Sequence, residues 1–258
     1  ANMRVNFNNI HYKMVLTHLC TILDECLSGF IKAIAMYYNG IVENKANLLA
    51  NNQAVVEGMI EGEVAFAYES RGRKYYTFFL SVSRLSSTSD ILPVTIPDDY
   101  NCFSLLHDGL YVRITRQFRS RNIFDGVKRR LILYLYVWNV ESPDAAENIA
   151  YGTDNNWIRL KGCICKPPVY RKTPLGREIT DIIVAVNRSF RRSDYIPCIC
   201  WGMSARQMAS AEIGEQFFLE GRIQSRIYFK KISDTELENR TAYEVSVFRL
   251  HEYREEAV

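Results

Sequence analysis

Apolar and polar residues alternate along most of the chain beyond residue 51, which is the pattern of half-buried β-strands. The clearest example is residues 176–201, where Ile182, Val184 and Val186 share one face of a predicted strand. A short basic loop follows, and a second predicted strand ends at Trp201. The same pattern predicts strands at residues 55–60, 74–83, 91–96, 111–118 and 130–140, and at residues 157–165, 178–187, 195–201, 216–228 and 241–251.

The sequence repeats itself at an offset of 104 residues, which becomes 105 after one inserted residue. A repeat of this length indicates duplicated domains rather than the short units of a solenoid. We therefore expect two copies of one small domain, over residues 52–145 and 155–258, joined by a linker over residues 142–155. The matched positions include Gly72 with Gly176, Arg84 with Arg188, Asp90 with Asp194, Pro93 with Pro197, and residues 119–121 with residues 224–226.

Each copy has the element order strand, strand, strand, helix, strand, strand, which is the order of the OB-fold, a five-stranded Greek-key barrel. In the second copy the helix is expected between Met203 and Ile213, because Ala205, Met208 and Ala211 recur there at three-residue steps. The predicted fold is therefore mostly all-β, with two OB-fold barrels in tandem. Two glycines inside predicted strands, Gly162 and Gly221, indicate a sharp bend or a close backbone contact.

Residues 1–51 lie outside the repeat. Apolar residues recur at three- and four-residue steps over residues 12–42, which predicts an amphipathic helix. Asp24, Glu25 and Lys32 interrupt this segment, so it lacks the uncharged run of ~18–20 residues that spans a bilayer. We expect an N-terminal helical extension that docks on the barrels or self-associates, and no membrane association.

The charge is unevenly distributed, although the chain as a whole carries a formal net charge of only +3. Residues 155–258 carry a net charge of +4 and residues 52–145 carry none, which favours the second copy as the contact for a polyanion. The cysteines number seven, an odd count without a disulfide framework, and no cleavable signal peptide is evident. A cytoplasmic location is therefore predicted.

The sequence predicts neither a metal site nor a catalytic centre. The Cys-x-Cys pairs at 163/165 and 198/200 place both thiols on one face of a strand, which suits buried apolar packing better than the Cys-x2-Cys turns of zinc sites. The four histidines are scattered, and no glycine-rich phosphate loop, H-E-x-x-H or G-x-S-x-G motif occurs. We expect no enzymatic activity, no metal and no cofactor.

The second copy resembles bacterial single-stranded DNA-binding proteins. The resemblance covers residues 155–252 in order, and the strand-four pattern of Gly221, Arg222 and Arg226 is among its more specific signatures. The first copy matches more loosely, with Arg116 in the place of Gly221. The chain therefore resembles a tandem-domain member of that family. The stretches that carry the resemblance are residues 160–162, 173–176, 185–190, 194–202 and 219–228.

The resemblance implies a site that stacks aromatic side chains on bases and holds phosphates with Arg and Lys, without sequence preference. The first copy is poorer in such residues, since Ile91 replaces Tyr195, and we expect it to bind weakly or to serve as a pairing partner. The implied stacking residues are Phe190, Tyr195, Trp201 and Tyr228. The implied phosphate contacts are Arg177, Arg188, Arg191, Arg192, Arg222, Arg226 and Lys230 in the second copy, and Arg84, Arg119, Arg121 and residues 128–130 in the first.

The family's replication proteins end in a glycine-rich linker and an acidic tail that recruits partners, whereas residues 251–258 hold only a few glutamates. We therefore expect a specialised or accessory member that acts on single-stranded DNA in replication, recombination or repair. Family members usually present four barrels, so a homodimer of this tandem chain is a further expectation. The alternative is an OB-fold protein–protein interaction module of a primosome or recombination complex.

Overall fold

Strand β1 (Asn52–Ser70) opens a five-stranded barrel, and its first half buries every second residue, from Asn52 through Ala54 and Val56 to Ile60. In this computed structural model the described residues are 51–252, except 85, 100–102, 125, 127–128, 142–154 and 232–236. The predicted N-terminal helix lies outside the described residues, as does the predicted linker except for its last residue, Asn155. The other strands of this first barrel are β2 (Arg73–Ser83), β3 (Ser89–Pro97), β4 (Tyr111–Phe124) and β5 (Arg129–Glu141).

The strands of the first barrel pair in the order β1–β2–β3–β5–β4 and return to β1. Only β3 and β5 run parallel, and the other pairs are antiparallel. The connection between β3 and β4 contains one 3-10 turn, Phe103–Leu105, where the second copy has its helix. This is the connectivity expected for an OB-fold, and closure of the barrel leaves no free sheet edge around its core.

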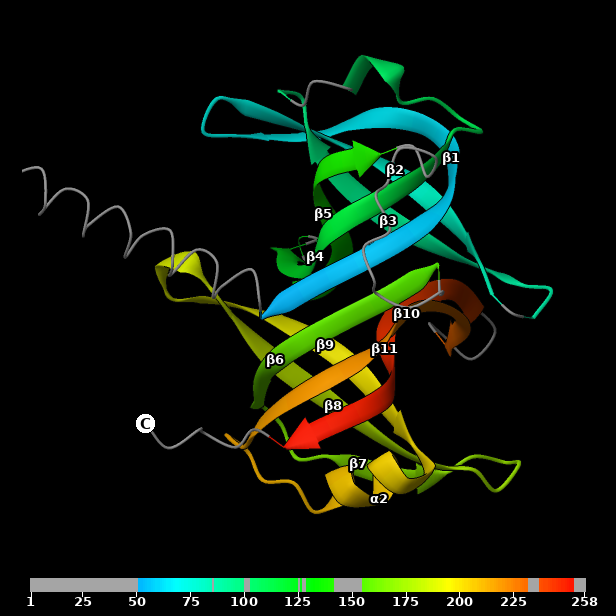
Figure 1. Cartoon of the computed structure of the whole chain (residues 1–258), viewed down its shortest axis with the longest axis vertical. Helices are drawn as coiled ribbons and strands as arrows, with labels where there is room; N and C mark the ends of the chain where they lie inside the picture. Colours follow the sequence, from blue (N-terminus) through cyan, green and yellow to red (C-terminus); the bar gives the residue numbers. More distant parts are fainter. Residues whose placement is uncertain are drawn as a thin grey trace, which may run out of the picture. The chain divides into compact units, whose positions relative to one another are not determined.

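The second barrel repeats this connectivity with β6 (Asn156–Ile164), β8 (Glu178–Arg188), β9 (Arg192–Trp201), β11 (Leu237–Glu252) and β10 (Gln216–Lys231). Helix α2 (Gly202–Ala209) follows β9 and buries Ala205 and Met208, as the three-residue spacing predicted (Figure 1). The short strand β7 (Val169–Lys172), which pairs with β8, was not predicted. All four of its residues are exposed, so the chain shows no alternation there.

The two barrels share a continuous sheet, because β1 and β6 pair antiparallel along Asn52–Val56 and Asn156–Leu160 (Figure 1). Ala54 pairs directly with Ile158, and these two residues occupy equivalent positions of the repeat. A pseudo-two-fold axis therefore passes between them, as in an isologous dimer interface. The two backbone hydrogen bonds that flank the pairing obey the same symmetry, from Glu57 N–H to Asn155 C=O at 2.7 Å and from Lys161 N–H to Asn51 C=O at 2.8 Å.

The strand glycines fill places where backbones approach closely, as predicted. A Cβ atom on Gly162 would lie 2.4 Å from the carbonyl oxygen of Ala185, and one on Gly221 would lie 2.4 Å from that of Ser246. Gly58, the equivalent of Gly162 in the first copy, makes the same approach to Ser81. These glycines let neighbouring strands cross at the bends of the barrels.

The cysteines differ partly from expectation. Cys198 and Cys200 on β9 are buried in the barrel core, whereas Cys163 and Cys165 at the end of β6 are only half-buried. Burial raises the pKa of the Cys200 thiol to about 12. Among the described residues, no helix is long and apolar enough to cross a membrane.

Candidate nucleic-acid interface

Strand β9 places two of the predicted stacking residues on the outer surface of the second barrel. Tyr195 and Trp201 alternate with the buried Ile196, Cys198 and Cys200, so both face outward, with 43% and 36% of their surface exposed. The indole N–H of Trp201 donates a hydrogen bond of 3.0 Å to the hydroxyl of Ser246 on the neighbouring strand β11. This bond orients the ring while part of its surface stays open to a ligand.

The turn between β8 and β9 exposes Phe190. This side chain is 92% exposed, and the residue has a left-handed backbone with φ of 61°, followed by Arg191 with φ of 55°. Non-glycine residues in this region cost of order 1–3 kcal/mol each and are concentrated at functional sites. The backbone of this turn therefore directs an aromatic ring and a guanidinium group toward solvent.

Tyr228 and Arg226 lie on the part of β10 that extends beyond the barrel. The Arg226 guanidinium carbon is 5.7 Å from the centroid of the Tyr228 ring, a cation–π distance. Arg226 also lies 3.9 Å from the Glu244 carboxylate. Lys230 follows on the same face of β10, where its side chain is half-buried.

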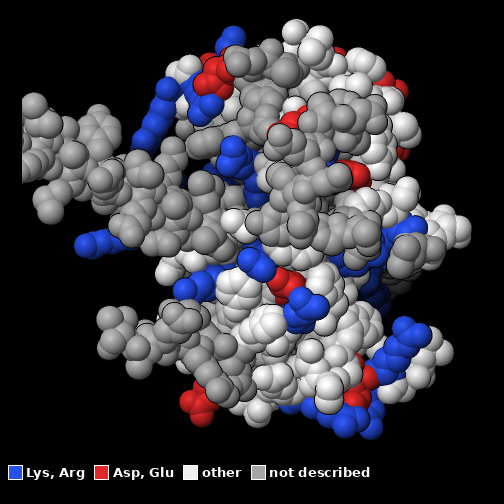
Figure 2. Space-filling view, in the orientation of Figure 1, with Lys and Arg blue, Asp and Glu red and all other residues white. Residues whose placement is uncertain are grey.

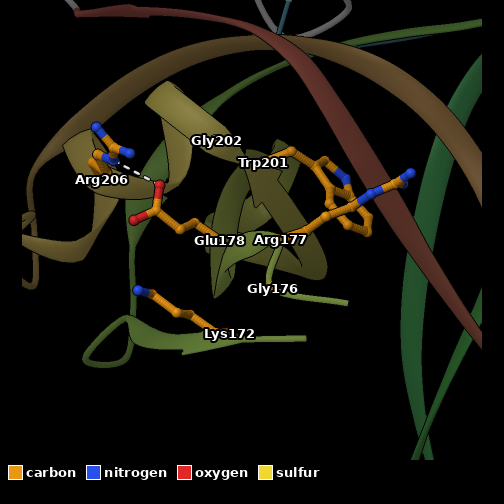
Figure 3. A pocket seen from close by; sticks show the side chains of 7 residues that line it. All are labelled: Lys172, Gly176, Arg177, Glu178, Trp201, Gly202 and Arg206. Atoms are coloured by element: carbon orange, nitrogen blue, oxygen red, sulfur yellow. Dashed lines mark hydrogen bonds and ion pairs between the residues drawn. The ribbon is translucent and has the colours of Figure 1, made fainter. Parts of the chain in front are cut away.

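A cavity of about 670 Å³ lies beside Trp201 and is lined by basic residues that the sequence analysis missed (Figure 3). Lys172 of β7 and Arg206 of α2 line this cavity together with the predicted Arg177. The acidic residue there is Glu178, and hydrogen bonds from the Tyr170 hydroxyl and the Arg206 Nε lower its pKa. These bonds leave Lys172 and Arg177 available for an anion.

Three of the predicted phosphate contacts are instead engaged in ion pairs with buried aspartates, and one of these pairs, Arg222 with Asp90, joins the two barrels. Arg84 and Arg222 bind the buried Asp90, at 2.5 and 3.2 Å, and Arg188 binds the buried Asp194 at 3.2 Å. Burial raises the pKa of Asp194, against the opposing effect of the Ser120 N–H and of Arg188. Between a quarter and a third of each arginine side chain remains exposed. Only the ion pair of Arg222 joins residues that are distant in the sequence, and the burial of both aspartates could not be predicted from spacing alone.

The first barrel carries aromatic residues that the repeat-based comparison overlooked. The Arg119 guanidinium carbon lies 3.9 Å from the centroid of the Tyr136 ring, and that of Arg121 lies 4.6 Å from the Tyr68 ring. Tyr68 in turn stacks on Tyr75, with centroids 4.7 Å apart. The signal was present as Tyr134 and Tyr136 at alternate positions of a predicted strand, but their equivalents in the second copy are not aromatic.

The face formed by β6 and β10 neutralises its own charges. Glu220 accepts hydrogen bonds from Arg159 at 2.8 Å and from Arg249 at 3.2 Å. Figure 2, which shows the molecule from the side on which β6 and β10 are in front, has basic and acidic side chains in contact on this face. The surface of β8, β9 and their connecting turn is therefore better suited to bind a polyanion.

Arg177, Arg191 and Arg192 are exposed, as are Arg129 and Arg130 of the predicted basic run, while Lys128 lies outside the described residues. Arg192 lines a second cavity with Arg119 and Arg188. In the part of the chain that the structure describes, no three His, Cys, Asp or Glu side chains are grouped so as to hold a metal ion.

Known proteins resemble this chain both in the sequence of its second barrel and in its arrangement of two barrels. Residues 155–251 match the model of the single-strand binding protein family. Single-stranded DNA-binding protein 2 of Listeria innocua is 35% identical over 80 residues, which are 28% of this chain and 50% of that protein. Single-stranded DNA-binding protein B of Bacillus subtilis is 34% identical over 80 residues, 71% of its length. The chain spans about half the length of several of the curated relatives that it matches.

The solved structure of the wild-type single-stranded DNA binding protein from Thermus aquaticus resembles this chain in fold. The TM-score is 0.61 at 15% sequence identity, and the match covers 80% of this chain and 95% of that one. Because so large a share of the chain is matched, the likeness extends over both barrels. The prediction of a mostly β fold with tandem OB-fold barrels is therefore confirmed.

Proposed function

Because the chain belongs to the single-strand binding protein family, we propose that it binds single-stranded DNA without sequence preference. Bases stack on the exposed aromatic side chains, and Arg and Lys side chains hold the phosphates. The protein acts without catalysis, in DNA replication, recombination or repair.

The observation that carries this proposal is the outward position of Phe190, Tyr195 and Trp201 beside basic residues. Exposed aromatic rings gain about 1–3 kcal/mol for each base that stacks on them, and every base offers a face for stacking. A duplex hides these faces, so the same rings discriminate strongly against paired DNA. Arg177 and Lys172 beside Trp201 supply the charge that the adjoining phosphates require.

The test is a fluorescence-anisotropy titration with a labelled oligo-dT and a duplex of equal length, at two salt concentrations. The proposal predicts tight binding of the single strand that weakens with salt, with a slope of about −0.7 for each phosphate contact. Equal affinity for duplex and single strand, or no binding of either, would contradict it. In the second case a protein–protein interaction module becomes the better interpretation.

We also propose that the chain forms a homodimer with four barrels. The support is the β1–β6 junction, which already joins two barrels by a self-complementary strand pairing, the kind of contact by which two identical subunits associate. Light scattering of the protein at micromolar concentration decides this, since a mass equal to a single chain of 29.9 kDa refutes the dimer.

A further inference from the structure

A cavity of about 570 Å³ lies at the junction of the two barrels, and both barrels contribute to its walls. From the first barrel come Arg71 and Tyr75 of the β1–β2 hairpin and Arg119 of β4. From the second come Arg188, Phe190 and Arg192, at the turn between β8 and β9. Four guanidinium groups and two aromatic rings from three separate segments of the sequence therefore meet at one place.

The charge of this cavity is poorly compensated. None of the described residues that line it is acidic. Arg119 donates its hydrogen bonds to the neutral side chain of Gln117, and burial together with the positive charge of Arg188 lowers the pKa of Arg119. The neighbouring Asp194 is bound to Arg188, while Arg71 and Arg192 take part in no ion pair within the described chain. A cluster of guanidinium groups with so little negative charge around it is suited to bind an anionic ligand, which supplies the missing negative charge.

Both turns that border the cavity hold their basic residues in fixed conformations. Arg71 and Gly72 form a two-residue hairpin turn with φ values of 55° and 75°, the geometry of a type I′ turn, which most often carries Asn-Gly. Phe190 and Arg191 are also left-handed. The β8–β9 turn is tied to the first barrel as well, because Asp194 accepts a hydrogen bond from the backbone N–H of Ser120, next to Arg119.

The cavity breaks the internal symmetry of the chain. At the pseudo-equivalent place, Leu175 stands for Arg71, Gln224 for Arg119, Ser86 for Phe190 and Thr88 for Arg192. The two arginines that remain there, Arg84 and Arg222, are both bound to Asp90. The exposed guanidinium groups and the aromatic ring are therefore present on one side of the pseudo-two-fold axis and replaced on the other.

We infer that this cavity is a phosphodiester-binding site shared by the two barrels, at which a single strand of DNA crosses from the second barrel to the first. The inference rests on the proposed function and extends it in two ways. The first barrel is a binding partner of the strand, through Arg71, Tyr75 and Arg119. The crossing takes place on one side of the chain only.

The test compares the wild-type protein with the double variant Arg71→Asn/Arg192→Gln in oligo-dT titrations at several salt concentrations. Asn suits the left-handed position of residue 71, and residue 192 is exposed, so both substitutions preserve the fold. The matched control is Lys74→Gln/Lys166→Gln, which also removes one exposed charge from each barrel but lies outside the cavity. Melting temperatures of all three proteins verify folding.

The cavity site predicts that the Arg71/Arg192 variant loses about 1.4 units of the salt slope, from two phosphate contacts at about 0.7 each, and binds about tenfold more weakly near 0.2 M salt. The control variant keeps the wild-type slope. A wild-type slope and affinity in the Arg71/Arg192 variant would overturn the shared site while leaving the proposed function intact. Failure of the wild-type protein to bind oligo-dT would overturn both.

Discussion

The carboxylate of Asp194 in the second barrel accepts a hydrogen bond of 2.7 Å from the backbone N–H of Ser120 in the first. The repeat provides the reciprocal bond, since Asp90 in the first barrel accepts one of 2.6 Å from the N–H of Ser225 in the second. The side chains of the two serines complete each contact by accepting hydrogen bonds from the N–H of Tyr195 and of Ile91, respectively. Two equivalent polar contacts thus flank the strand pairing that joins the barrels.

These contacts predict that Asp194→Ala and Asp90→Ala each lower the free energy of unfolding by about 1–3 kcal/mol. Each substitution leaves a backbone N–H at the barrel junction without its acceptor; Asp194→Ala also deprives Arg188 of its partner, and Asp90→Ala deprives both Arg84 and Arg222. Urea unfolding measures the change. Asp181→Ala is the control, because its ion pair with Arg171 is well exposed and should contribute at most about 1 kcal/mol. Costs no greater than that of the control would show that the buried aspartates do not hold the barrels together.

The close strand crossings predict that Gly162→Ala destabilises the protein by about 1–3 kcal/mol. The added Cβ would lie 2.4 Å from the carbonyl oxygen of Ala185, so the strands must move apart. Thermal unfolding is the measurement, and Gly176→Asn is the control, since residue 176 has open space and a φ of 76° that Asn tolerates. A melting temperature unchanged in Gly162→Ala would refute the close approach.

Because the Cys200 thiol is buried, we predict that the free energy of unfolding falls as the pH rises in the alkaline range. In the unfolded chain this thiol ionises near 9, whereas burial keeps it protonated in the folded protein up to about 12. The folded state therefore binds more protons between these values, and its stability falls as the pH rises through them. Relative to Cys200→Ala, the wild-type protein should lose unfolding free energy between pH 8 and pH 10.5 in chemical denaturation. Parallel pH profiles of the two proteins would argue that residue 200 is accessible to solvent.

The stacking residues predict a large effect on affinity and a small one on stability. Phe190→Ala/Tyr228→Ala should weaken binding of every single-stranded sequence alike, by about 1–3 kcal/mol for each base that loses its ring. Phe229→Ala is the matched control, because Phe229 is 69% exposed and follows Tyr228 directly on β10, so its side chain points to the opposite face. Anisotropy titrations measure the affinities. Equal losses in the control and the double variant would remove the stacking assignment.

Much of the fold follows from the sequence because its signals are local. Barrel strands bury alternate residues, so the runs around Ile182 and Val184 could be placed from their spacing. The repeat then located the first barrel, whose own motifs are weaker. Strand β7 escaped because its residues are all exposed, and strand β9 begins three residues before the predicted strand, at Arg192.

The site was less predictable, because the aspartates that hold its arginines also make hydrogen bonds across the barrel junction. Arg84 and Arg188 each have an aspartate nearby in the sequence, but nothing there reveals that this aspartate is buried and also binds the other barrel. The carry-over of roles by equivalent positions also hid Arg71 and Tyr75, whose equivalents in the second copy are Leu175 and Ile179. Arg71 enters the cavity through a hairpin turn, so its role depends on the folded hairpin.

The most direct test of single-strand binding is a tryptophan-fluorescence titration with oligo-dT and with duplex DNA of equal length, in the wild-type protein and in Trp201→Phe. Trp201 is exposed on β9 whereas Trp157 is buried, so a base stacked on the barrel face should quench the emission of Trp201. The predicted result is strong quenching of the wild-type protein by the single strand alone, reduced by salt and largely lost in Trp201→Phe. Quenching by neither DNA, or quenching that persists unchanged in Trp201→Phe, would contradict the proposed interface.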